Sequence, residues 1–220
     1  MIDLFLDTVN PDEIKNYLPT GVIKGVTSNP TLLWKEKKAV DKQLEEIAAC
    51  QPDMLFVQLV GETVDELAAS YEELKNRELG VTIGLKINMN QVGLEFVHQL
   101  KTQKVEEKIL GTAIYSAEQG ILGTLAGCDY LAPYINRMSN VNIDPYHVIK
   151  QIREFIDSRE ASTQIMGASF KNIKQVLDAL SAGAHTATIP ADVFEGMVNN
   201  PLATDAIHVF NTHGKELSQF

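Results

Sequence analysis

Eight short runs of apolar and β-branched residues recur along the chain, separated by polar loops and by stretches with helical periodicity. The runs span residues 2–8, 22–29, 54–61, 81–88, 108–114, 129–135, 163–170 and 185–191. Amphipathic helices are predicted over residues 63–76, 90–103, 116–127, 144–158 and 171–183. This alternation of strands and helices predicts a parallel sheet whose strands are joined by crossover helices.

Eight such repeats in 220 residues fit a closed (β/α)8 TIM barrel of the α/β class. A doubly wound open sheet is the structural competitor, but the sequence contains neither GxGxxG nor GxxxxGK[ST], the motifs of its nucleotide-binding versions. No linker divides residues 1–220, so we expect one domain. The tail from about residue 203 to 220 reads as an extra C-terminal helix, which either docks on a neighbouring subunit or caps the barrel.

The charge and the hydropathy of the chain restrict its partners. A formal charge of −10 argues against nucleic acid, because phosphate backbones bind to basic surfaces, but a small phosphorylated ligand could still be held by a local cluster of cations. No segment reaches the roughly 18 consecutive apolar residues of a membrane span, and the acidic start, MIDLFLDTVNPDE, is unlike a signal peptide. We therefore expect a cytoplasmic protein with no membrane partner. Cys50 and Cys128 lack the spacing of metal ligands, so we also expect no metal site.

The stretch VTIGLKINMN, residues 81–90, contains one lysine within an alternating pattern. Ile83, Leu85 and Ile87 share one face of the predicted strand, so Lys86 lies on the other face. In a barrel, the apolar face of a strand packs against the outer helices and the opposite face points into the interior. The pattern therefore predicts an interior lysine.

The same alternation places Asp7 and Gln58 in the interior, near the carboxyl-terminal strand ends where barrel active sites form. Two interpretations of Lys86 remain open. A buried ammonium group is costly unless it is paired, and Asp7 could form a structural ion pair with it. Alternatively, burial lowers the lysine pKa and leaves neutral amine, which can attack a carbonyl group to form a Schiff base. The protonated imine then withdraws electrons from the neighbouring carbon–carbon bond, so that an aldol bond can break.

Several separated motifs resemble the transaldolase family, and most closely its small-subunit branch of fructose-6-phosphate aldolases and short transaldolases. They are GVTSNPTLL at 25–33, Lys86 on the fourth strand, LGTAIYSAEQGILGTLAGCDYLAPYINR at 110–137 and GASFKN at 167–172. The motifs are collinear over nearly the whole chain. The resemblance implies a single-domain barrel that forms a Schiff base with a keto sugar phosphate, without metal or organic cofactor.

The resemblance also implies a role for individual residues. Lys86 corresponds to the nucleophile, and Asp7 to the first-strand aspartate that handles the proton of the C4 hydroxyl as the C3–C4 bond breaks. Thr27 and Asn29 correspond to a loop whose asparagine orients the dihydroxyacetone part of the substrate. Thr112 resembles a threonine that holds a catalytic water together with the polar residue of the third strand. For Thr27 and Asn29 alone, a simple turn before a proline is the competing interpretation.

The phosphate end of such a substrate requires cations and N–H donors. By the resemblance, Arg137, Ser169 and Lys171 are expected to bind it, since an arginine fork, a hydroxyl and loop N–H groups suit a phosphate dianion. Taken alone, Lys171 also fits a solvated residue at a helix start.

Two positions favour one branch of the family, and a third departs from it. Gln58 and Tyr134 resemble the fructose-6-phosphate aldolases, whereas transaldolases generally have glutamate and phenylalanine there. Because a glutamine cannot act as a carboxylate base, we expect a water to be activated by Gln58, Thr112 and Tyr134 together. Asn88 stands where the family commonly has proline, and this puts substrate preference and turnover in question.

The sequence thus favours a class I aldolase that reversibly cleaves fructose 6-phosphate to dihydroxyacetone and glyceraldehyde 3-phosphate. A transaldolase that transfers the dihydroxyacetone unit between sugar phosphates is the alternative. A non-catalytic sugar-phosphate-binding barrel is a more distant one, since fold does not imply function. The expected partners are a sugar phosphate or dihydroxyacetone and other copies of the chain, for which the resemblance suggests a pentamer or decamer.

Overall fold

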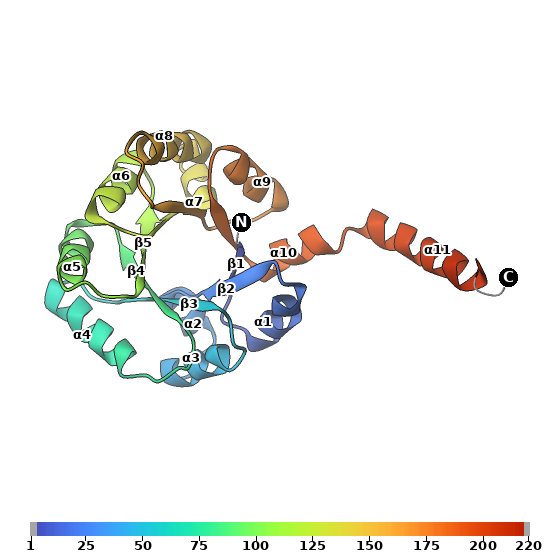
Figure 1. Ribbon diagram of the computed structural model, residues 1–220, viewed down its shortest axis with the longest axis horizontal. Coiled ribbons are helices and arrows are strands. Elements are labelled where there is room, and N and C mark those ends of the chain that lie inside the picture. The colour runs from blue at the N-terminus through green and yellow to red at the C-terminus, as the bar shows by residue number, and fades with distance from the viewer. Residues whose placement is uncertain (1–3, 218–220) are drawn as a thin grey trace.

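The computed structural model describes residues 4–217 and contains a closed barrel of eight parallel strands that follow one another in chain order (Figure 1). The strands are β1 (Leu4–Asp7), β2 (Ile23–Thr27), β3 (Met54–Gln58), β4 (Ile83–Asn88), β5 (Lys108–Ile114), β6 (Tyr130–Pro133), β7 (Gln164–Gly167) and β8 (Thr186–Ile189). The predicted (β/α)8 barrel is confirmed, and the open sheet was the wrong alternative. Residues 2–3 of the first predicted strand and residues 218–220 of the predicted tail lie outside the described residues.

Helices surround the barrel and connect its strands (Figure 1). They are α1 (Pro11–Tyr17), α2 (Pro30–Lys35), α3 (Val40–Ala48), α4 (Val64–Lys75), α5 (Gln91–Thr102), α6 (Ala117–Ala126), α7 (Ile135–Ser139), α8 (Pro145–Ser158), α9 (Ile173–Ser181), α10 (Ala191–Val198) and α11 (Pro201–Leu217), with a short 3-10 helix, η1 (Leu18–Thr20). The five predicted helices correspond to α4, α5, α6, α8 and α9, with ends correct to within two residues. Polar side chains cap the amino termini of several helices. At the start of α5, for example, Oδ1 of Asn90 accepts the N–H of Gly93 at 2.9 Å.

The core has two parts, as the strand alternation predicts. One cluster of buried apolar side chains lies between the strands and the helices, and a smaller cluster fills the barrel interior. The interior cluster includes Phe5, Phe56 and Leu110. Gly84 makes room for it, because a Cβ atom at this inward position would lie 2.3 Å from the ring of Phe56. The amino-terminal half of the barrel is therefore packed with apolar side chains.

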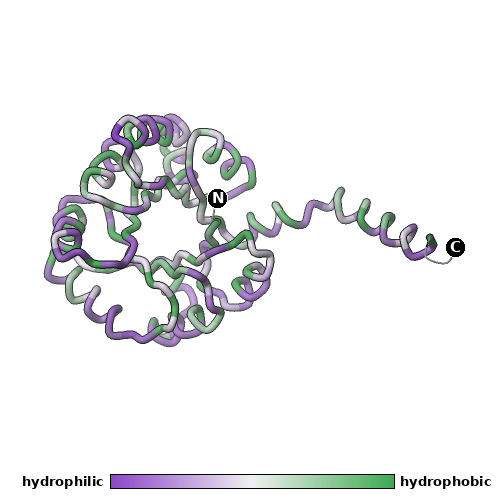
Figure 2. The backbone as a smooth tube through the Cα atoms, in the orientation of Figure 1, coloured by the Kyte–Doolittle hydropathy of each residue, from purple (hydrophilic) through white to green (hydrophobic). Residues whose placement is uncertain are grey.

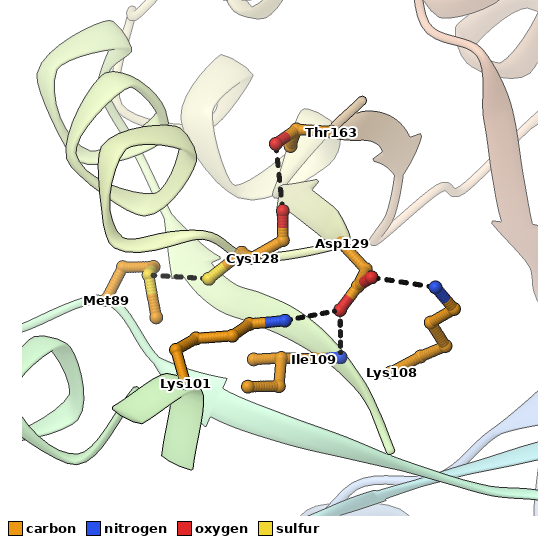
Figure 3. A network of polar contacts seen from close by, with 7 residues as sticks. All are labelled: Met89, Lys101, Lys108, Ile109, Cys128, Asp129 and Thr163. Carbon is orange, nitrogen blue, oxygen red and sulfur yellow. Dashed lines mark hydrogen bonds and ion pairs between the residues drawn. The ribbon is translucent and has the colours of Figure 1, made fainter. Parts of the chain in front are cut away.

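A polar network ties the amino-terminal ends of β5 and β6 to α5 (Figure 3). The carboxylate of Asp129 accepts hydrogen bonds from Nζ of Lys101 at 3.0 Å, Nζ of Lys108 at 2.9 Å and the N–H of Ile109 at 3.0 Å. Burial acts to raise the pKa of Asp129, but the hydrogen bonds from Ile109 and the two lysines outweigh it, so the pKa is lowered. The network therefore stabilises the end of the barrel that is opposite the carboxyl-terminal strand ends.

The last helix, α11, projects away from the barrel and does not cap it (Figure 1). All its described residues are exposed, including the large apolar side chains of Leu202, Ile207, Phe210 and Leu217. Hydrophobic and hydrophilic segments are mixed along it (Figure 2). The predicted extra C-terminal helix is thus confirmed. Between residues 4 and 217, no helix combines the length and the apolar character that crossing a membrane requires.

Candidate active site

A cavity of about 680 Å³ opens at the carboxyl-terminal ends of the strands, the end at which barrel enzymes place their active sites. Most of the site residues predicted from the sequence line it. These are Asp7, Asn29, Gln58, Lys86, Tyr134, Arg137, Ser169 and Lys171. The two others, Thr27 and Thr112, do not line the cavity, and each forms a hydrogen bond to a residue that does.

Lys86 lies inside the barrel with only 5% of its surface exposed. Its Nζ atom donates a hydrogen bond to the backbone carbonyl of Ser28 at 2.9 Å. In the sheet it is the register partner of Gln58 on β3 and of Leu110 on β5. Burial lowers the pKa of Lys86, and the nearby charge of Asp7 opposes this only in part. The predicted interior position is confirmed, and the environment favours the neutral amine.

Asp7 faces the same cavity from β1, but it does not neutralise the lysine directly. Among the described residues, the ion pairs include no contact between Asp7 and Lys86. Burial raises the pKa of the Asp7 carboxyl, and the charge of Lys86 and a hydrogen bond from Thr27 offset this only in part. The structural ion pair considered from the sequence is therefore not formed, and the two groups interact through space across the cavity.

Two threonines form a chain of hydrogen bonds that ends at Asp7. The hydroxyl of Thr27 donates to Oδ1 of Asp7 at 3.0 Å, and it lies 2.7 Å from the hydroxyl of Thr188. Because a hydroxyl has a single hydrogen, Thr188 donates to Thr27 when Thr27 donates to Asp7. This chain of hydrogen bonds orients the carboxylate and favours its ionised form.

Thr112 and Tyr134 form a hydroxyl pair at the wall of the cavity, with their oxygen atoms 2.9 Å apart. Burial raises the pKa of Tyr134, which keeps the phenol protonated, while the hydrogen bond with Thr112 acts in the opposite direction. Ala113, which follows Thr112 in the chain, has a left-handed backbone with φ of 56°. It lies at an irregularity in the pairing of β5 with β6. Gln58 does not bond to this pair; its Nε2 atom donates to Oδ1 of Asn88 at 3.2 Å. Of the three residues predicted to activate a water, Thr112 and Tyr134 are thus hydrogen-bonded to each other, and Gln58 is not bonded to either.

The mouth of the cavity holds the expected cations. Arg137 stacks its guanidinium 5.0 Å from the ring centre of Tyr134 and donates to the hydroxyl of Tyr115 at 3.2 Å. Ser169 has a left-handed backbone with φ of 61°, a strained conformation of the kind that clusters at functional sites. Lys171 is exposed beside it. The positive charge and the hydroxyl predicted for a phosphate group therefore lie together at the opening.

Asn29 has a structural contact and also faces the cavity. Its Oδ1 atom accepts the N–H of Leu32 at 3.0 Å and so caps the amino terminus of α2. The amide nitrogen is not required for capping. Asn29 thus combines the turn expected from the sequence before Pro30 with a side chain that can donate to a ligand.

Sequence reasoning missed three contributors to the site. Thr188 lines the cavity from β8, and the alternation of Thr186 and Thr188 with alanine and isoleucine was the available signal. Tyr115 holds Arg137, and it stands within a motif already recognised. The carbonyl of Ser28 holds Lys86, a backbone contact that no residue pattern reveals. Over residues 4–217, no group of three or more His, Cys, Asp or Glu side chains is arranged as metal ligands would be.

Comparisons with known proteins identify the family of the chain. The family model described as transaldolase/fructose-6-phosphate aldolase matches residues 4–219. A probable fructose-6-phosphate aldolase of Streptococcus pneumoniae is 37% identical over 215 residues, which cover 96% of this chain and 95% of that protein. A probable transaldolase of Maridesulfovibrio salexigens is 32% identical over 218 residues, covering 99% of this chain and 100% of that protein. A probable transaldolase 2 of Listeria monocytogenes is 29% identical over 215 residues, covering 98% and 97%.

Proposed function

Since the chain belongs to the transaldolase/fructose-6-phosphate aldolase family, we propose that it is a class I aldolase that reversibly cleaves fructose 6-phosphate to dihydroxyacetone and glyceraldehyde 3-phosphate. The main support is the buried amine of Lys86, which lines a cavity together with an acid and has a lowered pKa. A lysine with a lowered pKa has a larger neutral fraction than an exposed lysine, and the neutral amine is the nucleophile.

In the proposed reaction, the neutral amine of Lys86 attacks the C2 ketone, and loss of water with uptake of one proton gives a protonated imine. The carboxylate of Asp7 takes the proton of the C4 hydroxyl, the C3–C4 bond breaks, and its electron pair moves into the imine to give an enamine. Glyceraldehyde 3-phosphate leaves. The proton that Asp7 took from the C4 hydroxyl passes to C3 of the enamine. Attack by water on the resulting imine then releases dihydroxyacetone and restores the amine, and the carboxylate of Asp7 is ready for the next cycle.

The mouth of the cavity suits the phosphate end of the substrate. Arg137 and Lys171 supply positive charge against an overall charge of −10, and Ser169 supplies a hydroxyl. We propose that these three residues bind the phosphate group and that Asn29 orients the dihydroxyacetone part through its amide nitrogen.

The cleavage activity is favoured over transfer because the water site lacks a carboxylate. Gln58, Thr112 and Tyr134 offer only neutral hydrogen-bonding groups, which suit protonation of the enamine and release of the ketone. A transaldolase that retains the enamine for a second aldehyde is the alternative, and it is supported by the two relatives named probable transaldolases.

An assay with and without an acceptor separates the two activities. We expect glyceraldehyde 3-phosphate to form from fructose 6-phosphate alone, at a rate that does not change when erythrose 4-phosphate is added. A coupled dehydrogenase assay measures the product directly. Formation of product only in the presence of the acceptor would establish transfer. Absence of both reactions, with no borohydride-trapped adduct on Lys86, would leave a sugar-phosphate-binding barrel.

We also propose that the chain forms a homo-oligomer in which α11 packs on a neighbouring copy. The helix is exposed along its described length, and three of its apolar side chains, Ile207, Phe210 and Leu217, share one helical face. Light scattering should give a mass of several chains, and the suggested pentamer or decamer is the expected result. Truncation before Pro201 should yield smaller species. A monomeric full-length chain would contradict this proposal.

A further inference from the structure

Asn88 and Gln58 are joined across neighbouring strands at the edge of the candidate active site. Nε2 of Gln58 donates to Oδ1 of Asn88 at 3.2 Å, and both side chains line the cavity that contains Lys86. We propose that Asn88 is a positioning residue that fixes the side-chain amide of Gln58 in one of its two orientations. This inference rests on the proposed aldolase function and assigns a role to the residue that departs from the family pattern.

The backbone around Asn88 is held firmly enough for this task. Asn88 is the register partner of Thr112, and the following N–H, that of Met89, donates to the carbonyl of Thr112 at 2.9 Å. The first turn of α5 packs closely on the backbone of Asn88, since a Cβ atom at Gly93 would lie 1.8 Å from the carbonyl oxygen of Asn88. Strand pairing and helix contact together leave Asn88 little freedom to shift.

A clamp from α6 fixes the residues on either side of this point. Nε2 of Gln119 donates to the carbonyl of Met89 at 3.1 Å and to that of Ala113 at 3.3 Å. Oε1 of the same side chain accepts the N–H of Tyr115 at 2.9 Å. The ends of β4 and β5 are thereby joined, which holds Asn88 at a constant position relative to the hydroxyl pair of Thr112 and Tyr134.

The orientation of the Gln58 amide decides what the cavity can do with a water molecule. An amide has an acceptor oxygen on one side and a donor nitrogen on the other, and the two orientations occupy nearly the same volume. With its nitrogen bound to Asn88, Gln58 turns its oxygen away from Asn88, so that Oε1 can accept a hydrogen bond from a water and orient it. A water that attacks the imine carbon must be oriented towards it, and its proton passes to a base such as the carboxylate of Asp7, which lines the same cavity. Asn88 therefore acts on imine hydrolysis through Gln58.

Kinetics of Asn88→Ala provide the test. Without the acceptor, the Gln58 amide samples both orientations, and we expect kcat for cleavage of fructose 6-phosphate to fall by about 10-fold, the effect of one misplaced hydrogen bond. Because hydrolysis of the covalent intermediate is slowed, KM should not rise. The fraction of enzyme trapped on Lys86 by borohydride during turnover should increase. A variant that was merely misfolded would be trapped less.

A double-mutant cycle tests whether Asn88 acts through Gln58. In a Gln58→Ala background, Asn88→Ala should cause no further loss of kcat, whereas independent effects would multiply. Asn88→Asp retains an acceptor for the Gln58 nitrogen, so its kcat should exceed that of Asn88→Ala. Its pH optimum should shift upward, since an added carboxylate near Lys86 favours the charged lysine. The proposal would be overturned if the losses of kcat caused by Asn88→Ala and Gln58→Ala multiplied in the double variant. It would also be overturned if kcat for Asn88→Asp were no higher than that for Asn88→Ala.

Asn90→Ala is the matched control, because Asn90 belongs to the same turn and caps α5 without contacting Gln58. It should lower the melting temperature and leave kcat and the trapped fraction near those of the wild type. If Asn88→Ala had wild-type kcat while the wild-type enzyme was active and trapped on Lys86, only the role of Asn88 would be rejected. If the wild-type chain gave neither product nor adduct, the proposed function itself would fail.

Discussion

Replacing Lys86 with Met is expected to reduce cleavage of fructose 6-phosphate on the order of 10⁴-fold or more, because the proposed imine, on which bond breaking depends, forms on this amine. The borohydride-trapped adduct with dihydroxyacetone should disappear as well. Methionine is unbranched and similar in length, so it fills the same space without a charge. Peptide mapping of the wild-type protein after trapping should place the adduct on the peptide that contains Lys86.

The same substitution should stabilise the fold. Lys86 is buried at 5% exposure without an ion-pair partner among the described residues, so its removal relieves the cost of desolvating a cation. A gain of about 1 kcal/mol, or a rise of about 3 °C in melting temperature, is the expected size. The folded-state pKa lies below the ordinary value of 10.5. The gain is therefore greatest at pH values below the folded-state pKa and vanishes as the pH rises to 10.5.

Lys42→Met is the control for Lys86→Met. Lys42 is exposed on α3, so its replacement should change neither turnover nor melting temperature. A Lys86→Met protein that retained turnover, or that still formed an adduct on another lysine, would remove the proposed mechanism. An inactive protein with a lower melting temperature would show that Lys86 is needed for folding.

Asp7→Asn should lower kcat by about 10²- to 10⁴-fold, the usual contribution of a positioned acid or base. Asparagine keeps an Oδ1 atom to accept the hydrogen bond from Thr27, which is 3.0 Å in the native protein, so the local structure should persist. The amide cannot take the proton of the C4 hydroxyl. Bond cleavage should therefore fail while imine formation on Lys86 continues, and trapping with dihydroxyacetone should still label the variant.

The pH dependence of trapping gives a second readout for Asp7→Asn. The charge of Asp7 raises the pKa of Lys86 against the larger lowering by burial. Its removal should lower the lysine pKa further, so that trapping extends to lower pH than in the wild type. Cleavage at the wild-type rate would exclude Asp7 as the base. Loss of trapping together with cleavage would show that Asp7 assists an earlier step, the formation of the imine.

Much of the fold and the centre of the candidate site could be predicted because strands alternate between two faces. Ile83, Leu85 and Ile87 fix the face that packs on helices, and the position of Lys86 follows without any knowledge of distant contacts. The same rule places Asp7 and Gln58. It would also have placed Thr188, had the pattern of the eighth strand been followed to its end.

Other features depend on contacts that alternation does not describe. Thr27 is the register partner of Asp7 and donates a hydrogen bond to it, and this contact depends on the register between β1 and β2. The bond of Gln58 to Asn88 likewise joins residues on adjacent strands that no local pattern connects. The left-handed backbone of Ala113 follows from an irregularity in strand pairing, at a residue type that rarely signals one. These contacts are properties of the closed sheet.

The carboxylate of Asp129 and its two lysines share no residue with the lining of the cavity. The polar network and the candidate active site thus lie at opposite rims of one barrel. Variants selected for heat resistance at the lower rim could be combined with variants selected for new ketone or aldehyde substrates at the upper rim, and their benefits should add. Such a division makes this barrel a practical starting point for directed evolution of the proposed aldolase activity.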